Sequence, residues 1–205
     1  LLGSSLSWAP IPLPFSDLQG ILSFSPDQVE TSSLTGKMGF SPFTLEGKVA
    51  DLLRPNPMMD LRMAAPLEAK DLQALLPSGF PSLPASAGPL PLKLSLQGTT
   101  QQLQFNQELG LESLSRQLSD GQVFSPTRDR FTLKGVLLQG EDAMIQAFGK
   151  ETHLEQGAEA SPLKGPVLVI DQAIFSLLSS EVQARGKFGL GVDQPLIQLS
   201  IAAHH

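Results

Sequence analysis

The sequence predicts an all-β, mainly antiparallel protein whose curved, repeat-containing sheet forms a groove or half-barrel, with one or two short helices. Three observations support this fold class. Apolar and polar residues alternate along much of the chain, glycine ends several of the alternating segments, and the connections are too short for helical crossovers. We expect roughly eight to twelve strands, each with one dry and one wet face.

The clearest alternation occurs in four segments, residues 43–49, 59–63, 90–96 and 197–201. Each of them places three or more apolar side chains on one face of a strand. Weaker strand candidates share a shorter or less regular alternation. They are residues 20–24, 103–109, 131–137, 167–170 and 182–190.

One short helix is expected over residues 66–76. Pro66 suits the first turn of a helix, the leucines that follow have helical spacing, and Pro77 would end it. Residues 170–178 fit both a helix and a β-hairpin, and we favour the strand. Residues 109–120 show the same ambiguity, which stays open.

The chain is expected to divide at a proline-rich segment. Residues 77–91 contain five prolines among serine, glycine and alanine, so they should form an irregular linker or covering loop. Residues 1–76 would form an N-terminal β segment with a short closing helix. Residues 92–203 would continue the same sheet system, and the histidines at 204–205 are interpreted as the remnant of a purification tag.

A five-residue pattern recurs along the chain. Residues 43–47 and 131–135 are identical at four of five positions, and residues 94–98 and 182–186 keep the order apolar, polar, apolar, polar, glycine. Such recurrence is typical of a repeat architecture.

Two of the copies extend further. After Gly47 the chain reaches Pro57 and a new alternation, and after Gly186 it reaches Pro195 and an alternation with the same offsets. This predicts two equivalent units of strand, glycine, strand, proline, strand. Glycine would let a strand bend or bulge, and proline would stand at a strand start.

Charge and composition restrict the partners. The net charge of −6 leaves no basic surface for a phosphate backbone, so no nucleic acid partner is expected. The chain has no cysteine, which excludes disulfides and thiolate metal sites. The uncharged stretches at residues 1–16 and 72–92 both contain several prolines and are not expected to be transmembrane helices.

No enzyme, cofactor or metal site is expected. Asp129 and the pair at 141–142 are the candidate paired carboxylates, but they flank turns and show no partner that would tune their acidity. His153 with Glu151 and Glu155 would give three ligands on one face of a strand, yet a solvated turn explains them better.

Several of these segments resemble AsmA-like envelope proteins. The resemblance rests on residues 34–36, residues 39–47, the alternation that Pro57 opens, and the helix around residues 71–72, and residues 182–203 are similar too. It covers about two-thirds of the chain. The resemblance implies a curved periplasmic sheet with an apolar groove, in a parent protein anchored in the bacterial inner membrane and involved in moving phospholipid for outer-membrane biogenesis.

The dry face of the sheet is the candidate site. Its phase predicts that nine apolar side chains point to one concave side. These groove candidates are Phe43, Leu45, Val49, Met59, Leu61, Met63, Ile197, Leu199 and Ile201. An open groove would bind phospholipid or another acyl-chain lipid. A closed apolar core would instead indicate a structural or assembly module of an envelope or secretion complex, and the sheet edges could bind envelope protein partners.

Overall fold

The computed structural model describes residues 4–8, 11–75, 88–113, 116–117, 123–124, 129–140, 142–148, 165–177, 180–189 and 197–204. The first six strands are β1 (Ser4–Trp8), β2 (Ile11–Gly20), β3 (Ser23–Ser25), β4 (Gln28–Met38), β5 (Ser41–Ala50) and β6 (Met58–Leu67). The next five are β7 (Leu90–Thr99), β8 (Gln102–Gly110), β9 (Arg116–Gln117), β10 (Val123–Phe124) and β11 (Arg130–Leu138). The last three are β12 (Val167–Leu177), β13 (Ser180–Gly189) and β14 (Ile197–His204), and the helices are α1 (Ala69–Leu75) and α2 (Ala143–Phe148).

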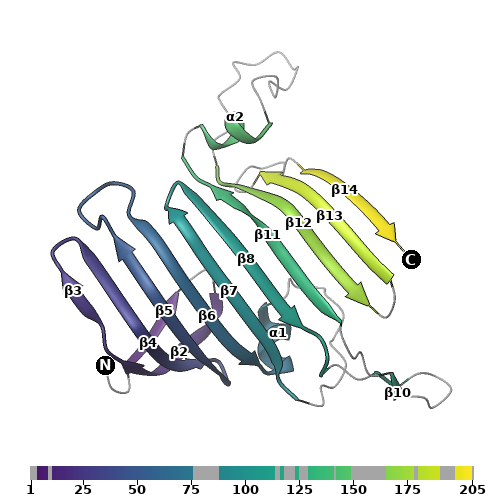
Figure 1. Ribbon diagram of the computed structural model, residues 1–205, viewed down its shortest axis with the longest axis horizontal. Helices are drawn as coiled ribbons and strands as arrows, with labels where there is room; N and C mark the ends of the chain where they lie inside the picture. The colour runs from purple at the N-terminus through teal and green to yellow at the C-terminus, as the bar shows by residue number, and fades with distance from the viewer. Residues whose placement is uncertain are drawn as a thin grey trace.

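Twelve of the strands form one antiparallel sheet (Figure 1). Its order is β1-β2-β4-β5-β6-β7-β8-β11-β12-β13-β14, with β3 pairing beside β4, while β9 and β10 pair only with each other. The predicted all-β class with two short helices is therefore confirmed. Strand β6 pairs directly with β7, so the sheet continues across the proline-rich segment.

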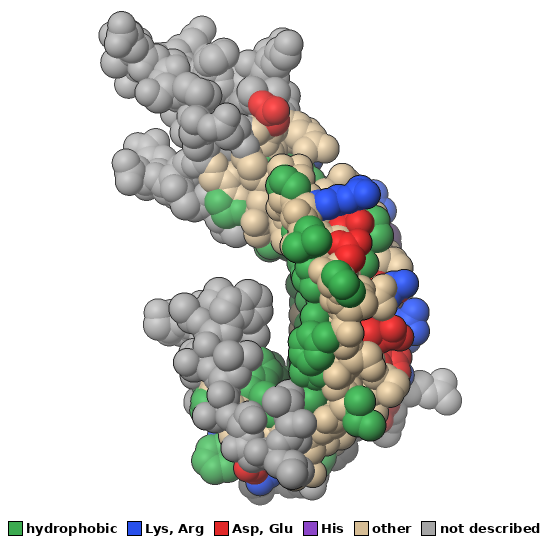
Figure 2. Space-filling view, turned by 90° about the vertical axis from the view of Figure 1, so that its left-hand side faces the viewer, with side chains coloured by type: hydrophobic (Ala, Val, Ile, Leu, Met, Phe, Trp, Pro, Cys, Tyr) green, Lys and Arg blue, Asp and Glu red, His purple; other side chains and the backbone are tan. Residues whose placement is uncertain are grey.

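The sheet is a curved wall with two different faces. We call the face that carries Phe43 and Leu92 the inner face and the opposite one the outer face. Figure 2 shows hydrophobic side chains lining the hollow of this wall, with Lys, Arg, Asp and Glu side chains on the side away from it. The alternation of the sequence thus separates a dry concave face from a wet convex one.

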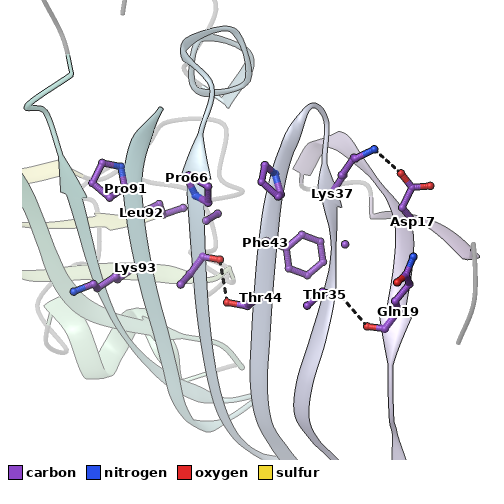
Figure 3. A pocket seen from close by; sticks show the side chains of 14 residues that line it. Asp17, Gln19, Thr35, Lys37, Phe43, Thr44, Pro66, Pro91, Leu92 and Lys93 are labelled. Atoms are coloured by element: carbon purple, nitrogen blue, oxygen red, sulfur yellow. Dashed lines mark hydrogen bonds and ion pairs between the residues drawn. The ribbon is translucent and has the colours of Figure 1, made fainter. Parts of the chain in front are cut away.

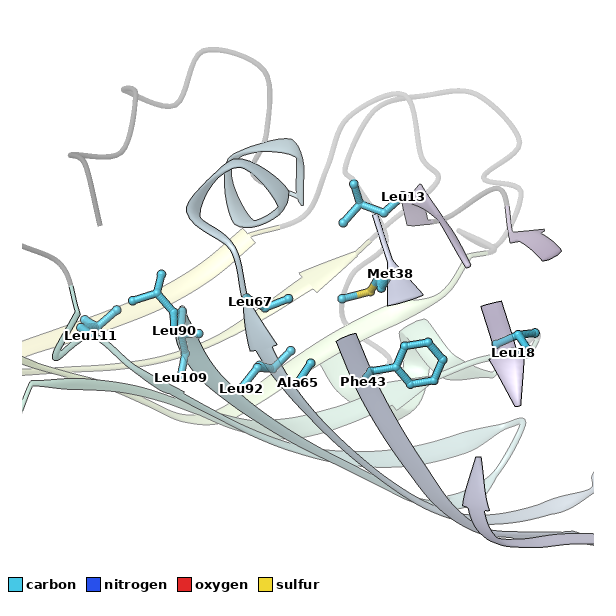
Figure 4. Close-up of a cluster of buried hydrophobic side chains, with 10 residues drawn as sticks. All are labelled: Leu13, Leu18, Met38, Phe43, Ala65, Leu67, Leu90, Leu92, Leu109 and Leu111. Atoms are coloured by element: carbon cyan, nitrogen blue, oxygen red, sulfur yellow. The ribbon is translucent and has the colours of Figure 1, made fainter. Parts of the chain in front are cut away.

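The main core lies on the inner face at one end of the strands, where β2 and α1 cover it (Figure 4). Phe15 of β2 packs edge-on against Phe43, with ring centroids 5.6 Å apart, and Leu72 and Leu75 of α1 join the cluster. The buried members are Leu13, Leu18, Met38, Phe43, Ala65, Leu67, Leu90, Leu92, Leu109 and Leu111.

A smaller cluster lies on the outer face at the other end of the strands. Ala143 and Ala147 of α2 pack there against Leu138 and Val167. The side chain of Lys187 donates to the carbonyl oxygen of Ala147 at 2.6 Å and connects α2 to β13. Each helix therefore covers a different face of the sheet.

A buried carboxylate fixes α1 to the turn between β4 and β5. Asp71 is 2% exposed and accepts hydrogen bonds from the Phe40 backbone N–H at 2.9 Å and from the Ser41 hydroxyl. The Ser41 oxygen in turn accepts from the backbone N–H of Glu68 at 2.9 Å. Because buried donors need acceptors, this network holds the helix over the core in one position.

The expected helix over residues 66–76 is shorter than predicted, and Pro66 does not lie in it. Helix α1 begins at Ala69, and Pro66 belongs to β6, where it pairs with Pro91 of β7. The strand phase continues to Leu67, which is 1% exposed, so burial on the inner face outweighs the preference of proline for a helix start. Two opposed prolines cannot exchange hydrogen bonds, so they occupy a pair position that needs no donor.

The predicted irregular segment 77–91 ends two residues earlier than expected. Leu90 and Pro91 open β7, and Leu90 is fully buried, so they are strand and not linker. Gly88 and Pro89 lie outside any strand, as expected. Residues 76–87 are outside the described part of the chain.

Four strands, β1, β2, β4 and β10, were not predicted, and the candidate at residues 20–24 was wrong in its bounds. Gly20 ends β2, and β3 starts at Ser23. Strand β2 contains Pro12 and Pro14, which precede Phe15, the first residue that pairs with β4. The prolines are tolerated because the ladder with β4 has not yet begun there.

Both ambiguous segments are now placed as far as the structure describes them. Residues 170–177 continue β12, so the favoured strand is confirmed. In residues 109–120, β8 ends at Gly110, a turn follows at residues 112–113, and Arg116–Gln117 forms β9.

Three of the four repeat glycines occupy one level of the sheet. Following the paired residues from β4 to β14 gives one continuous row, which we call the central row. It consists of Thr31, Gly47, Leu61, Leu96, Phe105, Gly135, Ile170, Gly186 and Leu199. Three of the four repeat glycines therefore lie in it, whereas Gly98 pairs with Met59 and Leu103 and lies outside it.

The two long repeat copies are equivalent in topology and facing. Gly47 pairs with Leu61 on the next strand as Gly186 pairs with Leu199, and each glycine strand follows a strand with a register shift. Gly47 has a φ of +128°, and an added Cβ would collide with the carbonyl oxygen of Asp60. Pro57 directly precedes β6, but Pro195 lies outside the described residues. Bulges and glycines at one level bend neighbouring strands together.

Candidate binding groove

The register places all nine predicted groove residues on the inner face. Across β5 and β6, Leu45 pairs with Met63 and Val49 pairs with Met59, and Phe43 is in phase with Leu45. The central row then leads from Leu61 to Leu199, so β14 presents its odd-numbered side chains to the same side. Ile197 and Ile201 are in phase with Leu199.

These nine residues differ greatly in exposure. Phe43 is 5% exposed in the covered core, and Leu45 and Met63 pack against that core. Val49, Met59 and Leu61 are half-buried. On β14, Ile197, Leu199 and Ile201 are 61%, 51% and 63% exposed. The structure therefore brings the nine together on one face but divides them between a closed core and an open surface.

Several inner-face residues were not among the predicted groove residues, although the same alternation marks them. They lie between β6 and β14 and complete the surface. They are Leu94, Leu96, Leu103, Phe105, Leu133, Leu137, Leu168, Ile170, Phe175, Val182 and Phe188. Most of these are half-buried, and Phe175 and Val182 are exposed by 38% and 37%.

Charge is confined to the other side of the wall. From β5 to β14, none of the paired residues on the inner face is charged. The paired Lys, Arg, Asp and Glu residues of these strands alternate with them and face outward, for example Lys48 opposite Asp60 and Lys134 opposite Asn106. The inner face therefore offers apolar contact without a charged group to fix a polar ligand.

A depression of about 620 Å³ lies on the outer face and not in the groove (Figure 3). It crosses the strands from β2 to β7, and Thr44, Pro66 and Lys93 contribute to its lining. At its rim, Lys37 and Asp17 form an ion pair of 2.8 Å, with both side chains about half exposed. Among the described residues that line the depression, Lys93 is the one further charged residue.

The candidate carboxylates do not meet. Asp129 precedes β11 and Asp142 follows it, so the length of a nine-residue strand, roughly 30 Å, separates them. Glu141 and residues 151–155, with the possible ligand His153, lie outside the described residues. Among the side chains that the structure does describe, no three His, Cys, Asp or Glu residues gather into a metal-binding group.

Comparison with known proteins gives no match. No family model, curated protein or solved structure matches the chain. In the part of the chain that the structure describes, neither helix is long and apolar enough to cross a membrane.

Proposed function

We propose that the uncovered part of the inner face binds the acyl chains of phospholipid or another lipid, without catalysis. The chain would be a periplasmic β-groove module of an AsmA-like envelope protein, whose parent is anchored in the bacterial inner membrane and serves outer-membrane biogenesis. One observation supports this most strongly: an uncharged apolar face continues beyond its cover to the exposed leucine and isoleucines of β14.

The energetics favour a chain-like apolar ligand. Burial of an aliphatic side chain is worth about 1.5–3 kcal/mol and burial of one methylene about 0.8 kcal/mol. An acyl chain lying against Leu61, Phe105 and Leu199 would gain this energy without a polar partner. Monomeric proteins rarely leave a large contiguous apolar surface exposed unless it binds something.

A structural or assembly module is the second candidate. The observation in its favour is that the same face already accepts protein, because Leu72 of α1 and Phe15 of β2 pack onto it. In that case, protein from a partner in an envelope or secretion complex would close the rest of the face. The two candidates differ in what co-purifies with the chain.

Native mass spectrometry of the purified protein tests the proposal, with co-purified phospholipid as the expected finding. The variant Leu61→Asp introduces a carboxylate into the half-buried part of the groove. The matched control is Met58→Asp on the same strand, because Met58 is 52% exposed and faces outward. We expect Leu61→Asp to lose lipid and Met58→Asp to keep it.

Thermal unfolding separates the two candidates. In an open groove the new carboxylate stays near water, so Leu61→Asp should cost only about 1 kcal/mol. In a closed core the same charge would be buried and should cost several kcal/mol. Lipid-free wild-type protein together with an unfolded Leu61→Asp variant would favour the assembly module.

A further inference from the structure

Two turns lie next to each other at the end of the strands opposite α1 (Figure 1). One turn, residues 51–54, joins β5 to β6, and the backbone N–H of Arg54 donates there to the carbonyl oxygen of Asp51 at 2.9 Å. The N–H of Leu52 donates to the carbonyl oxygen of Asp27, in the turn between β3 and β4, at 3.2 Å. This bond ties the two turns together, and we call residues 24–27 and 51–54 the tip.

The tip presents large apolar side chains to solvent. Leu53 is 81% exposed and Phe24 is 71% exposed, and Leu52 is exposed as well. Turns normally carry glycine, proline, asparagine, aspartate or serine at such positions, because they face water. Neighbouring apolar side chains that protrude from two joined turns indicate contact with an apolar partner.

The charges of the tip do not provide an electrostatic attachment. Asp51 and Arg54 form an ion pair of 3.3 Å with each other, and the exposed Asp27 adds a single carboxylate. With its net charge of −6, the chain is repelled by an anionic surface. The tip therefore suits a partner that offers apolar contact and carries no net negative charge.

A continuous apolar row connects the tip to the groove. Phe24 pairs with Val29 and Val29 pairs with Val49, so the side chain of Phe24 lies on the inner face. The pairs continue from Val49 strand by strand to Ile197 of β14, and every residue in this row is apolar or glycine. The inner face thus reaches the tip without a charged residue in between.

We propose that the tip docks on a zwitterionic phospholipid bilayer, with Leu53 and Phe24 inserted between the headgroups. A bilayer fits this surface better than a protein partner, because it accepts protruding apolar side chains and supplies the acyl chains that the groove would bind. The inference rests on the proposed function and deepens it, since it assigns the end of the strands at which lipid enters. The opposite end is covered by α1 and β2.

Vesicle flotation tests the docking. Wild-type protein should float with vesicles of phosphatidylcholine and stay bound at high salt, because the contact is apolar. Addition of anionic phosphatidylglycerol should not strengthen binding, since the chain itself is acidic. Binding that requires the anionic lipid would contradict the proposal.

Substitutions at the two ends of the strands locate the contact. The double variant Phe24→Ser with Leu53→Ser should lower partitioning onto phosphatidylcholine vesicles at least about tenfold, because binding scales with the apolar area that is buried. The matched control is Phe40→Ser, since Phe40 is 66% exposed in the turn between β4 and β5, at the end near α1. It should bind like wild type. Circular dichroism should show the same fold in both variants, because all three side chains are exposed.

A fluorescent label gives a second reading that keeps the apolar residues in place. The chain contains no cysteine, so Ser25→Cys can carry a single environment-sensitive fluorophore next to Phe24. Its emission should shift to the blue when vesicles are added. The same label at Glu68→Cys, an exposed position beside α1, should not respond.

Several results would overturn the proposal. They are a wild-type protein that stays off phosphatidylcholine vesicles, as expected if the tip binds a protein instead, a double variant that floats like wild type, and two labels that respond equally. Vesicle binding without co-purified lipid would contradict the proposed function alone. Co-purified lipid without vesicle binding would contradict this inference alone.

Discussion

The covered and uncovered parts of the inner face are built from the same kinds of apolar residue, which alternate with polar residues in the same pattern. Leu67 at the covered end is 1% exposed, whereas Ile201 at the open end is 63% exposed, although both stand in phase on one sheet. The difference lies in what packs on them, since β2 and α1 cover only the first of the two regions. Alternation therefore decides which side of a strand is dry, and a separate covering element decides whether that side is core or groove.

The largest effect on stability should come from a charge placed in the covered part of β6, compared with the same charge in its uncovered part. Leu67→Asp buries a carboxylate without a partner and removes a buried leucine, so it should lower the free energy of unfolding by roughly 5 kcal/mol. Leu61→Asp, six residues earlier on the same face of β6, should cost about 1 kcal/mol. Urea denaturation followed by circular dichroism measures both. Equal losses would show that the open end is also a closed core.

Loss of the hydrogen bonds that hold α1 over the core should expose the covered part of the inner face. Asp71→Ala leaves the Phe40 N–H and the Ser41 hydroxyl without their carboxylate acceptor, at a cost of roughly 3 kcal/mol. Hydrogen exchange should also accelerate at the C-terminal end of β6. The control Asp17→Asn removes only the charge of an exposed ion pair and keeps a residue type that tolerates the positive φ of this position, so it should cost less than about 1 kcal/mol. If both variants behave alike, Asp71 does not hold the cover.

The two repeat copies should respond unequally to an added methyl group. Gly47→Ala forces alanine into a φ of +128° and should cost roughly 2 kcal/mol. Gly186 has no such φ, and its Cβ would approach the Gln198 oxygen at 2.8 Å, a longer distance than a Cβ at position 47 would have from the Asp60 oxygen. Gly186→Ala should therefore cost less than about 1 kcal/mol. The comparison of melting temperatures would contradict this account if Gly186→Ala were the worse variant.

The smallest effect on stability is expected at the open end. Ile201→Ser removes an exposed side chain and should change the free energy of unfolding by less than about 0.5 kcal/mol. Lipid occupancy in native mass spectra should nevertheless fall, because apolar contact area is lost. A large loss of stability would mean that Ile201 is packed in solution.

The strands predicted most clearly are those whose alternation is uninterrupted, and a break in phase hid two of the missed strands, β2 and β4. Strands β5, β6, β7 and β14 keep one phase along their length. Strand β4 changes phase at its bulge between Thr31 and Leu34, and β2 contains a residue with positive φ at Asp17. A period-two pattern cannot be recognised across such a break, so both strands were missed.

The sequence predicted which face of the sheet the candidate residues occupy, but not how exposed each of them is. Phase alone placed Phe43 and Ile197 on one side of the sheet. It could not show that Phe43 is covered, because burial depends on contacts with Phe15 and α1 that are distant in sequence. The outer-face depression was equally hidden, since its lining is shared by five neighbouring strands, β2 and β4 to β7, whose pairing and register the sequence pattern does not give.

Because the bends lie in the central row, the number of strands in the sheet can change without a change in the curvature of the sheet. Each strand unit that carries a glycine or a bulge in the central row widens the sheet and bends at the same level as its neighbours. Duplication or deletion of a strand unit could therefore lengthen or shorten the wall during evolution without redesigning its bend. A substitution at one such glycine would change the bend of a single strand and leave the bends of the other strands unchanged.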